Sequence, residues 1–353
     1  MRDLQQPGRS PVYASNAMVS TSHPLSTTAA LDVLRKGGNA VDAAIAAVTV
    51  QCVVEPSSTS VGGDCFCLYL PANSKTPIAI NGSGRAPKRL SADWLIANGF
   101  DTIPQQSPHS VTVPTAVDAW VNLNKDFGNK PLGDLLEYAI DYANDGYPVG
   151  QRVAFDFSIT SELIKGDQDL SDLFLVNGKT LPIGFRHKQT NLAKTLSEIA
   201  KKGREGFYSG WVVDDILEKL TVLGGFHQKD DFEDAISNYV TPISCQFRGH
   251  KVWQCPPNGQ GVIALLLLNM ASQISVFGDD PINRERIHYE IEAGKLAYRD
   301  RAAVLADPEF SNVPVQQLLS QEYASELVSQ IKADMPICSL PPSSLPRHSS
   351  TVY

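Results

Sequence analysis

The sequence lacks the features that mark membrane proteins, zinc proteins and nucleic-acid-binding proteins. An apolar run such as 262–270 is far shorter than the roughly 20 residues that a membrane-spanning helix needs. No block of Lys and Arg occurs and the formal net charge is −8, which argues against nucleic acid as a main partner. Neither a CxxC motif nor a Cys/His ligand spacing is present, so no metal site is expected. Residues 1–18 contain no apolar signal-peptide core, and a cytoplasmic protein is therefore the expectation.

Six cysteines occur, and most lie inside apolar runs where a thiol behaves as a small hydrophobic group. They are Cys52, Cys65, Cys67, Cys245, Cys255 and Cys338. Nothing in their spacing requires disulfides. The chain has 353 residues, 42% of them hydrophobic, which is enough for one large globular domain or two smaller ones.

The stretch 37–70 predicts a buried helix, a glycine turn and a buried strand. Apolar residues keep helical spacing over 40–54, with Asn39 as the expected N-cap and Asp42 in the first turn. The helix should end at Glu55 because the residue before a proline avoids the α conformation. A small-residue loop, 57–63, then leads into an apolar strand over 65–70 with a hairpin partner at 78–80.

The remaining pattern predicts a chain rich in helices. A short strand is expected at 18–22, followed by a helix over 26–36 that Ser26 caps and Gly37 ends. Further helices are expected at 116–127, 132–144, 155–175, 192–202, 212–223, 262–270 and 283–305, and a strand pair at 238–255.

After Ile331 the periodicity disappears. Residues 336–350 contain four prolines and five serines, which is typical of a linker or an exposed tail. Earlier in the chain, the GxG sequence within 81–87 invites comparison with a dinucleotide-binding loop. The third glycine is replaced by a proline and the strand-to-helix context is missing, so tight NAD binding is not expected.

Several stretches, taken in order, resemble the gamma-glutamyltransferase family. They are GGNAVDAA at 37–44, Glu55-Pro56 with Gly62-Gly63, GFY at 206–208, PPNGQG at 256–261 and EAGKLAYRDRAAVLADPEF at 292–310. The sequence of the turn Gly62-Gly63-Asp64 is similar to that of the same turn in a subgroup without a secretion signal. This subgroup includes transferase-like proteins, oxamate amidohydrolases and cephalosporin acylases. The resemblance covers nearly the whole chain.

The resemblance implies an N-terminal-nucleophile hydrolase that cuts its own precursor into two subunits. The implied fold is α/β (α+β), a four-layer αββα sandwich that is incomplete without the small subunit. Residues 1–335 would form the large-subunit part of a single domain, 336–350 the linker to the junction, and 351–353 the start of the small subunit. The protein's partners would be its own small subunit and a small-molecule amide, with no cofactor, and this chain alone should be inactive.

By position in the family, Thr351 corresponds to the nucleophile and Ser350–Thr351 to the bond that is cut. A threonine hydroxyl needs a base to react at neutral pH. An N-terminal threonine carries one, because its free α-amino group has a pKa near about 8 and can accept the hydroxyl proton directly or through one water. Before cleavage, the same hydroxyl can attack the carbonyl of residue 350. The alternative is an ordinary threonine in a disordered tail.

Arg85 is the candidate substrate-binding residue. True glutamyl transferases grip the substrate α-carboxylate with the arginine of an Arg-Glu-x-Ala-Pro pattern, whereas here Ser83 stands at that position and Arg85 follows two residues later. This departure favours an amide other than a standard γ-glutamyl donor, such as oxamate or an N-acyl compound. A surface ion pair is the alternative role for Arg85, and a non-catalytic binding or scaffold fragment is the alternative for the chain.

The other polar candidates are expected to be structural. His109, His250 and His288 have no carboxylate or thiol at a telling spacing. Asp300 and Asp307 are expected to form ion pairs with the neighbouring arginines. The loops 57–63 and 256–261 are either simple turns or neighbours of the active site.

Overall fold

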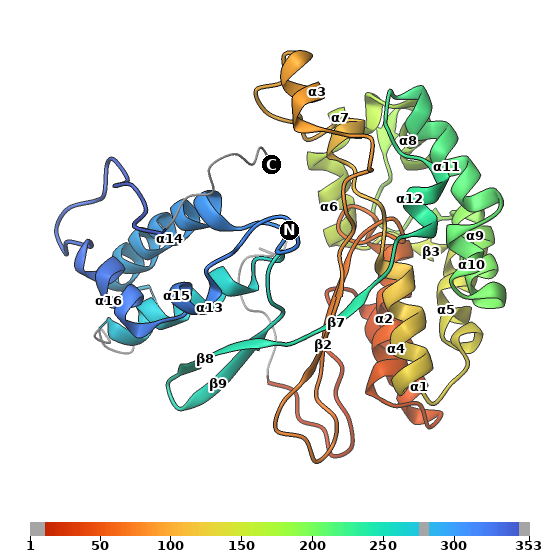
Figure 1. Cartoon of the computed structure of the whole chain (residues 1–353). Helices are drawn as coiled ribbons and strands as arrows, with labels where there is room; N and C mark the ends of the chain where they lie inside the picture. Colours follow the sequence, from red (N-terminus) through yellow and green to blue (C-terminus); the bar gives the residue numbers. More distant parts are fainter. Residues whose placement is uncertain (1–10, 275–281, 346–353) are drawn as a thin grey trace. The chain divides into compact units, whose positions relative to one another are not determined.

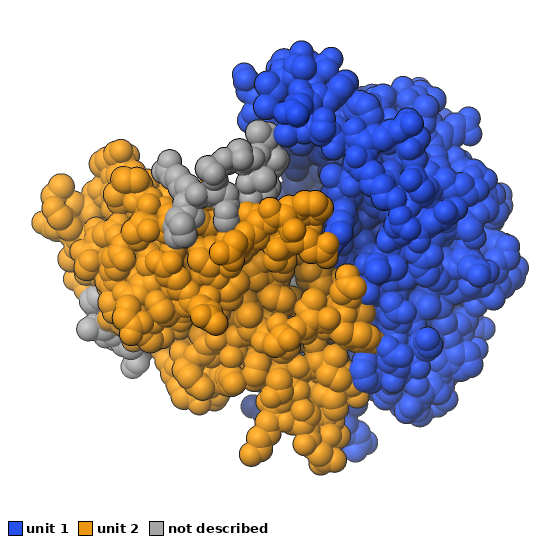
Figure 2. Space-filling model, in the orientation of Figure 1, with its two compact units in different colours: residues 1–65, 82–237 blue, residues 66–81, 238–353 orange. Residues whose placement is uncertain are grey.

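The computed structural model describes residues 11–274 and 282–345, and the chain divides into two compact units (Figures 1 and 2). Unit 1 comprises residues 1–65 and 82–237, and unit 2 comprises residues 66–81 and 238–353. The prediction that residues 1–335 belong to one larger domain stays a prediction.

Unit 1 is mostly helical, with short strand pairs between the helices. Its elements are α1 (Pro24–Arg35), α2 (Ala40–Val54), α3 (Ala92–Ala97), η1 (Pro108–Ser110), α4 (Ala116–Phe127), α5 (Leu132–Asp145), β3 (Tyr147–Pro148), α6 (Gln151–Ile159), α7 (Ser161–Lys165), α8 (Gln168–Phe174), β4 (Leu175–Val176), β5 (Lys179–Thr180), β6 (Arg186–His187), α9 (Thr190–Lys202), α10 (Glu205–Tyr208), α11 (Trp211–Val222) and α12 (Lys229–Glu233).

Helix α2 lies at the centre of unit 1, and its predicted bounds are confirmed. It packs against α1, α4 and α5, and its buried residues lie on all sides of the helix. At its start, the Asn39 side chain accepts hydrogen bonds from the Val41 and Asp42 amides, while the Asp42 carboxylate accepts one from the Asn39 amide at 2.9 Å. This capping box satisfies the amides of the first turn.

Three predictions in unit 1 are wrong. Residues 18–22 do not form a strand; the hydroxyl of Thr21 instead donates to the His23 carbonyl at 2.8 Å. His23, rather than Ser26, caps α1, because Ser26 lies within the first turn of the helix and donates to the Ala47 carbonyl of α2. The single helix expected over 155–175 is broken into α6, α7 and α8, where Asp167 caps the last of these.

Unit 2 contains a small sheet, a hairpin and a helical core. Its elements are β1 (Cys65–Tyr69) and β2 (Ile78–Gly82), whose end residues Cys65 and Gly82 fall in unit 1, followed by β7 (Asn238–Val240), β8 (Ile243–Phe247), β9 (His250–Gln254), α13 (Gly261–Gln273), α14 (Arg284–Val304), α15 (Val315–Leu318) and α16 (Gln321–Ser329). The sheet order is β1-β2-β7, with β2 antiparallel to β7, and β8 pairs with β9.

Strand β1 and its partner β2 are confirmed, but β1 is only half-buried. Phe66 and Leu68 point to the exposed side and alternate with more buried neighbours. An apolar run was expected to be buried on both faces, and the period of two shows instead that one face is covered. Apolar content alone does not distinguish these two situations.

Helices α13, α14 and α16 form the core of unit 2. The predicted buried helix over 262–270 is confirmed as part of α13. The tail differs from its prediction at one residue, because Leu345 is only 3% exposed and belongs to this core. The rest of the described part of this segment, 336–344, is exposed or half-buried, as expected, and its role as a linker to a junction stays a prediction.

Candidate active site

The predicted nucleophile, Thr351, lies outside the described residues. The predicted substrate-binding residue, Arg85, follows β2, and its side chain is exposed. Its backbone carbonyl accepts a hydrogen bond from the Val113 amide at 2.8 Å. The backbone of Arg85 is therefore held, although its side chain is at the surface.

Gly84 makes this close approach possible. A Cβ at Gly84 would lie 1.6 Å from the Val113 carbonyl oxygen, so no other residue fits without moving the backbone. The Gly84 amide also donates to Asp64 Oδ1 at 3.1 Å. Asp64 is the last residue of the Gly62-Gly63-Asp64 turn, so this bond ties two stretches that the sequence singled out separately.

The same turn reaches the start of α4. The Gly63 carbonyl accepts hydrogen bonds from the Thr115 and Ala116 amides at 3.3 and 3.1 Å. No side chain caps α4, so a backbone carbonyl takes over part of that role. The segment Val113–Ala116 thus holds both Arg85 and Gly63, and we call it the central bridge.

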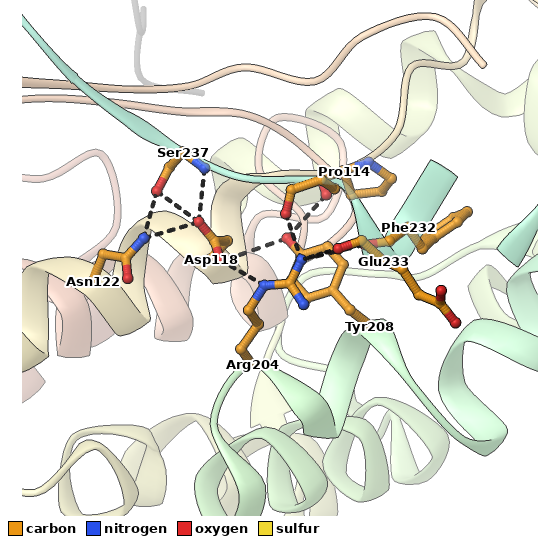
Figure 3. A network of polar contacts seen from close by, with 9 residues as sticks. Pro114, Asp118, Asn122, Arg204, Tyr208, Phe232, Glu233 and Ser237 are labelled. Atoms are coloured by element: carbon orange, nitrogen blue, oxygen red, sulfur yellow. Dashed lines mark hydrogen bonds and ion pairs between the residues drawn. The ribbon is translucent and has the colours of Figure 1, made fainter. Parts of the chain in front are cut away.

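A buried network of polar side chains contacts the central bridge and the start of α4 (Figure 3). Asp118 of α4 is 2% exposed, and its carboxylate accepts hydrogen bonds from Arg204 Nε at 2.8 Å and from the Ser237 amide and hydroxyl, both at 2.7 Å. The Tyr208 hydroxyl donates to the Pro114 carbonyl at 2.9 Å and accepts from the Asp118 amide. The hydrogen bonds to the Asp118 carboxylate are charge-assisted, and such bonds are about twice as strong as neutral ones.

Burial keeps the Tyr208 hydroxyl neutral by raising its pKa, so it acts as a donor to Pro114. The Arg204 guanidinium lies over the Tyr208 ring, 4.6 Å from its centroid, and adds a cation–π contact. The GFY stretch is therefore part of the support of the central bridge. The sequence analysis did not identify Asp118 or Ser237 as important. Asp118 could have been noticed, because it is a carboxylate between Val117 and Ala119 on the buried side of an amphipathic helix.

The loop 256–261 borders a cavity of about 290 Å³ within unit 2. The cavity is lined by Phe66, Cys67, Leu68, Gln254, Cys255, Gly259, Gln260 and Gly261. Asn81 Nδ2 and Asn258 Oδ1 are 2.9 Å apart, which holds the loop to β2. Burial raises the pKa of the Cys255 thiol to about 11 and also raises that of Cys67. Both thiols are therefore protonated at neutral pH and are poor nucleophiles.

The remaining polar candidates have structural contacts. The Asp300 carboxylate pairs with Arg299 and accepts a hydrogen bond from the Tyr323 hydroxyl at 2.6 Å, as its predicted ion pairing requires. Among the described residues, no group of three or more His, Cys, Asp or Glu side chains is arranged to hold a metal ion. None of the helices in the described ranges is long and apolar enough to cross a membrane.

The fold matches the N-terminal-nucleophile hydrolases of the gamma-glutamyltranspeptidase type. The gamma-glutamyltranspeptidase of Helicobacter pylori superposes with a TM-score of 0.88 at 26% identity, over 97% of this chain and 100% of that chain. A cephalosporin acylase from Bacillus halodurans superposes with a TM-score of 0.85 at 38% identity, over 94% of this chain and 62% of that chain.

The chain belongs to the gamma-glutamyltranspeptidase family, whose model matches residues 26–351. It is 36% identical to a glutathione hydrolase-like proenzyme of Bacillus subtilis and 30% identical to an oxamate amidohydrolase proenzyme of Klebsiella pneumoniae. These matches cover 97% and 90% of this chain but only 64% and 60% of the two relatives. The chain therefore spans less than two thirds of the length of these relatives.

Proposed function

We propose that this chain is the large-subunit part of a self-processing threonine amidohydrolase or acyl transferase. The observation that carries the proposal is the family match, which runs from residue 26 through Thr351 and includes relatives named as proenzymes. The complete protein would form the four-layer αββα sandwich together with its small subunit. It would act in the cytoplasm and need no cofactor.

In the proposed self-processing step, the Thr351 hydroxyl attacks the carbonyl carbon of Ser350. The Ser350–Thr351 amide breaks as an ester forms to the Thr351 oxygen, and the hydroxyl proton passes to the freed amine. Water then hydrolyses the ester, which leaves a carboxylate on Ser350 and restores the hydroxyl of Thr351. The new α-amino group serves as the base for later turnovers.

In turnover, the Thr351 oxygen would attack a substrate amide to form an acyl-enzyme ester and release the amine. Water or a second amine would then take the acyl group. The donors that stabilise the oxyanion are expected on the small subunit. The backbone that carries Arg85, held by Gly84 and the central bridge, would present the guanidinium to a carboxylate of the substrate.

Two observations favour a small amide other than a standard γ-glutamyl donor. Ser83 stands where the glutamyl transferases have their arginine, and the relatives include an oxamate amidohydrolase and acylases. We therefore place oxamate-type and N-acyl amides beside γ-glutamyl amides as candidate substrates. A non-catalytic binding or scaffold fragment is the alternative of another class.

The test is to express the complete reading frame as wild type and as Thr351→Ala, and to follow both on denaturing gels. We expect two bands from the wild type and one from the variant, because only a hydroxyl at 351 can attack residue 350. Two bands from both proteins would reject Thr351 as the nucleophile. If no further β-rich segment follows Tyr353 in the gene, the scaffold alternative wins. A panel of γ-glutamyl, oxamate and N-acyl amides on the cleaved enzyme then decides the substrate.

A further inference from the structure

The Tyr208 hydroxyl completes a helix start that lacks its usual cap. The N-cap residue of α4, Thr115, makes no side-chain cap bond, and its hydroxyl donates to the Val113 carbonyl at 3.2 Å instead. The amide of Asp118, the third residue of α4, therefore needs an acceptor from elsewhere. The Tyr208 hydroxyl accepts from this amide at 3.3 Å and donates to the Pro114 carbonyl at 2.9 Å. One hydroxyl thus holds the backbone on both sides of the N-cap residue.

The Pro114 carbonyl is close along the chain to the amide that holds Arg85. The Val113 amide donates to the Arg85 carbonyl at 2.8 Å, and Pro114 is the next residue. A proline ring locks its own φ, and the residue before a proline is restricted to extended conformations. Few soft dihedrals therefore separate the Pro114 carbonyl from the Val113 amide. A bond that fixes this carbonyl also fixes the amide to which Arg85 is bonded.

The Tyr208 ring is itself held in place, because it is buried and covered by a fixed guanidinium. Tyr208 is 1% exposed, and the Arg204 guanidinium lies 4.6 Å from its ring centroid. Arg204 Nε donates to Asp118 at 2.8 Å. Its Nη2 donates to the Glu233 and Ala235 carbonyls at 2.9 and 2.7 Å (Figure 3). The hydroxyl at the end of the ring is therefore a fixed point to which the central bridge is bonded.

We infer that Tyr208 is a positioning residue for substrate binding, because its hydroxyl holds the backbone from which Arg85 reaches a substrate carboxylate. The inference rests on the proposed function, in which the Arg85 guanidinium binds that carboxylate. An exposed arginine side chain already loses conformational freedom when it binds a ligand. A backbone that is fixed beforehand adds nothing to this cost, whereas a loose turn adds the cost of ordering it. Tyr208 therefore acts on the affinity for charged substrates and not on the reacting amide.

The test uses the matured enzyme with Tyr208→Phe, which keeps the buried ring and removes only the hydroxyl. Tyr138→Phe is the matched control, since it removes a hydroxyl of α5 that is bonded to Lys36 Nζ at 3.0 Å. Arg85→Ala is made alone and together with Tyr208→Phe. The substrates are a carboxylate-bearing amide from the panel and its methyl ester, which lacks the charge. Melting temperatures are measured on precursors that also carry Thr351→Ala.

We expect Tyr208→Phe to raise KM for the carboxylate substrate about three- to tenfold, the effect of losing about one neutral hydrogen bond. KM for the ester, and kcat for both substrates, should stay at the wild-type values. In the Arg85→Ala background the same change should have no further effect on KM, because the side chain that depends on the held backbone is gone. Tyr138→Phe should match the wild type with both substrates.

A hydroxyl that serves stability alone gives a different result. It would lower the melting temperature, and any loss of activity would be the same for the carboxylate and for the ester. An unchanged KM for the carboxylate in Tyr208→Phe would therefore overturn the inference. An equal effect on the two substrates, or an undiminished effect in the Arg85→Ala background, would overturn it as well.

Ser237→Ala is the second variant if Tyr208→Phe does not yield folded protein. It removes one hydroxyl donor to the Asp118 carboxylate, which in turn holds Arg204 over the Tyr208 ring. It should raise KM for the carboxylate alone, by about two- to threefold. An unchanged KM in this variant would again overturn the inference.

The failures can be told apart. A wild-type precursor that stays uncut rejects the proposed function and, with it, the inference. An enzyme that acts on no carboxylate-bearing amide, or whose KM does not change in Arg85→Ala, rejects Arg85 as the carboxylate ligand together with the inference. A KM that changes in Arg85→Ala but not in Tyr208→Phe rejects the inference alone.

Discussion

Arg85 combines a held backbone with an exposed side chain. Its carbonyl is bonded to the Val113 amide, and Gly84 before it cannot accept a side chain. Truncating Arg85 should therefore change the surface chemistry at this point and leave the turn in place. This makes Arg85 a suitable position at which to separate a substrate contact from a structural role.

We expect Arg85→Ala to lower kcat/KM of the matured enzyme for an amide that carries a carboxylate, mainly through KM. A hydrogen bond to a charged group is worth about 1.5–3 kcal/mol, which corresponds to roughly 10- to 100-fold. Steady-state kinetics measure the effect. Arg89→Ala, an exposed arginine on the same stretch, is the control and should behave as the wild type. Equal kinetics for all three proteins would assign Arg85 to the surface ion pair.

At the scale of single elements, α2 depends on one carboxylate at its start. Asp42 is fully buried and accepts hydrogen bonds from the Asn39 amide and, from the loop before α5, the Asn129 and Lys130 amides. The carboxylate therefore caps one helix and ties the approach to another. Its position in the first turn also suits the helix dipole.

We expect Asp42→Ala to lower the free energy of unfolding by about 3 kcal/mol, because it removes a cap and leaves several amides without an acceptor. Urea unfolding followed by circular dichroism measures this loss. Asp32→Ala, which breaks a surface pair with Arg35 on α1, is the control and should cost about 0.5 kcal/mol or less. Similar losses in the two variants would show that the Asp42 contacts contribute little.

At the scale of the whole molecule, the histidines divide unevenly between the units. Among the described residues, burial lowers the pKa of His23, His187 and His227, and all three lie in unit 1. His187 shows the largest change, with a pKa of about 4, and packs among aromatic rings such as those of Tyr147 and Phe174.

This distribution predicts that acid destabilises unit 1. An unfolded histidine binds a proton below about pH 6.5, whereas folded His187 binds one only near pH 4, so the unfolded state gains protons between these values. The stability that neutral His187 contributes is thus fully present above about pH 6.5 and is lost as the pH falls towards 4. The total for His187 is about 3 kcal/mol.

Urea unfolding at pH 7.5 and pH 4.5 tests this expectation. We expect His187→Phe to flatten the pH dependence, because it keeps a ring among aromatic neighbours and removes the titrating group. His250→Gln, an exposed histidine of unit 2, should keep the wild-type pH dependence. An unchanged slope in His187→Phe would mean that other groups carry the acid sensitivity.

The sequence by itself determined the elements whose signals are local. The helix at 40–54 with its Asn39 cap, and the helix at 116–127, have the bounds that their apolar spacing predicts. Capping and helical periodicity act over a few residues, so they can be found without knowledge of the fold. The ordered set of motifs likewise indicated the family without any structure.

Only the tertiary structure decided what the polar residues and the irregular segments do. Gly84 lies against Val113, Asp118 accepts hydrogen bonds from Ser237, and the Ile337 amide donates to Glu292 of α14, all through contacts between residues far apart in the chain. Residues 336–350 were expected to form a linker or an exposed tail because they lack periodicity, and most of the described part, 336–345, is exposed. This part is nevertheless held at Ile337 by a backbone group bonded to a side chain of a distant helix. A backbone carbonyl is the same chemical group at every position, so its partner cannot be inferred from composition and is fixed only when the chain packs.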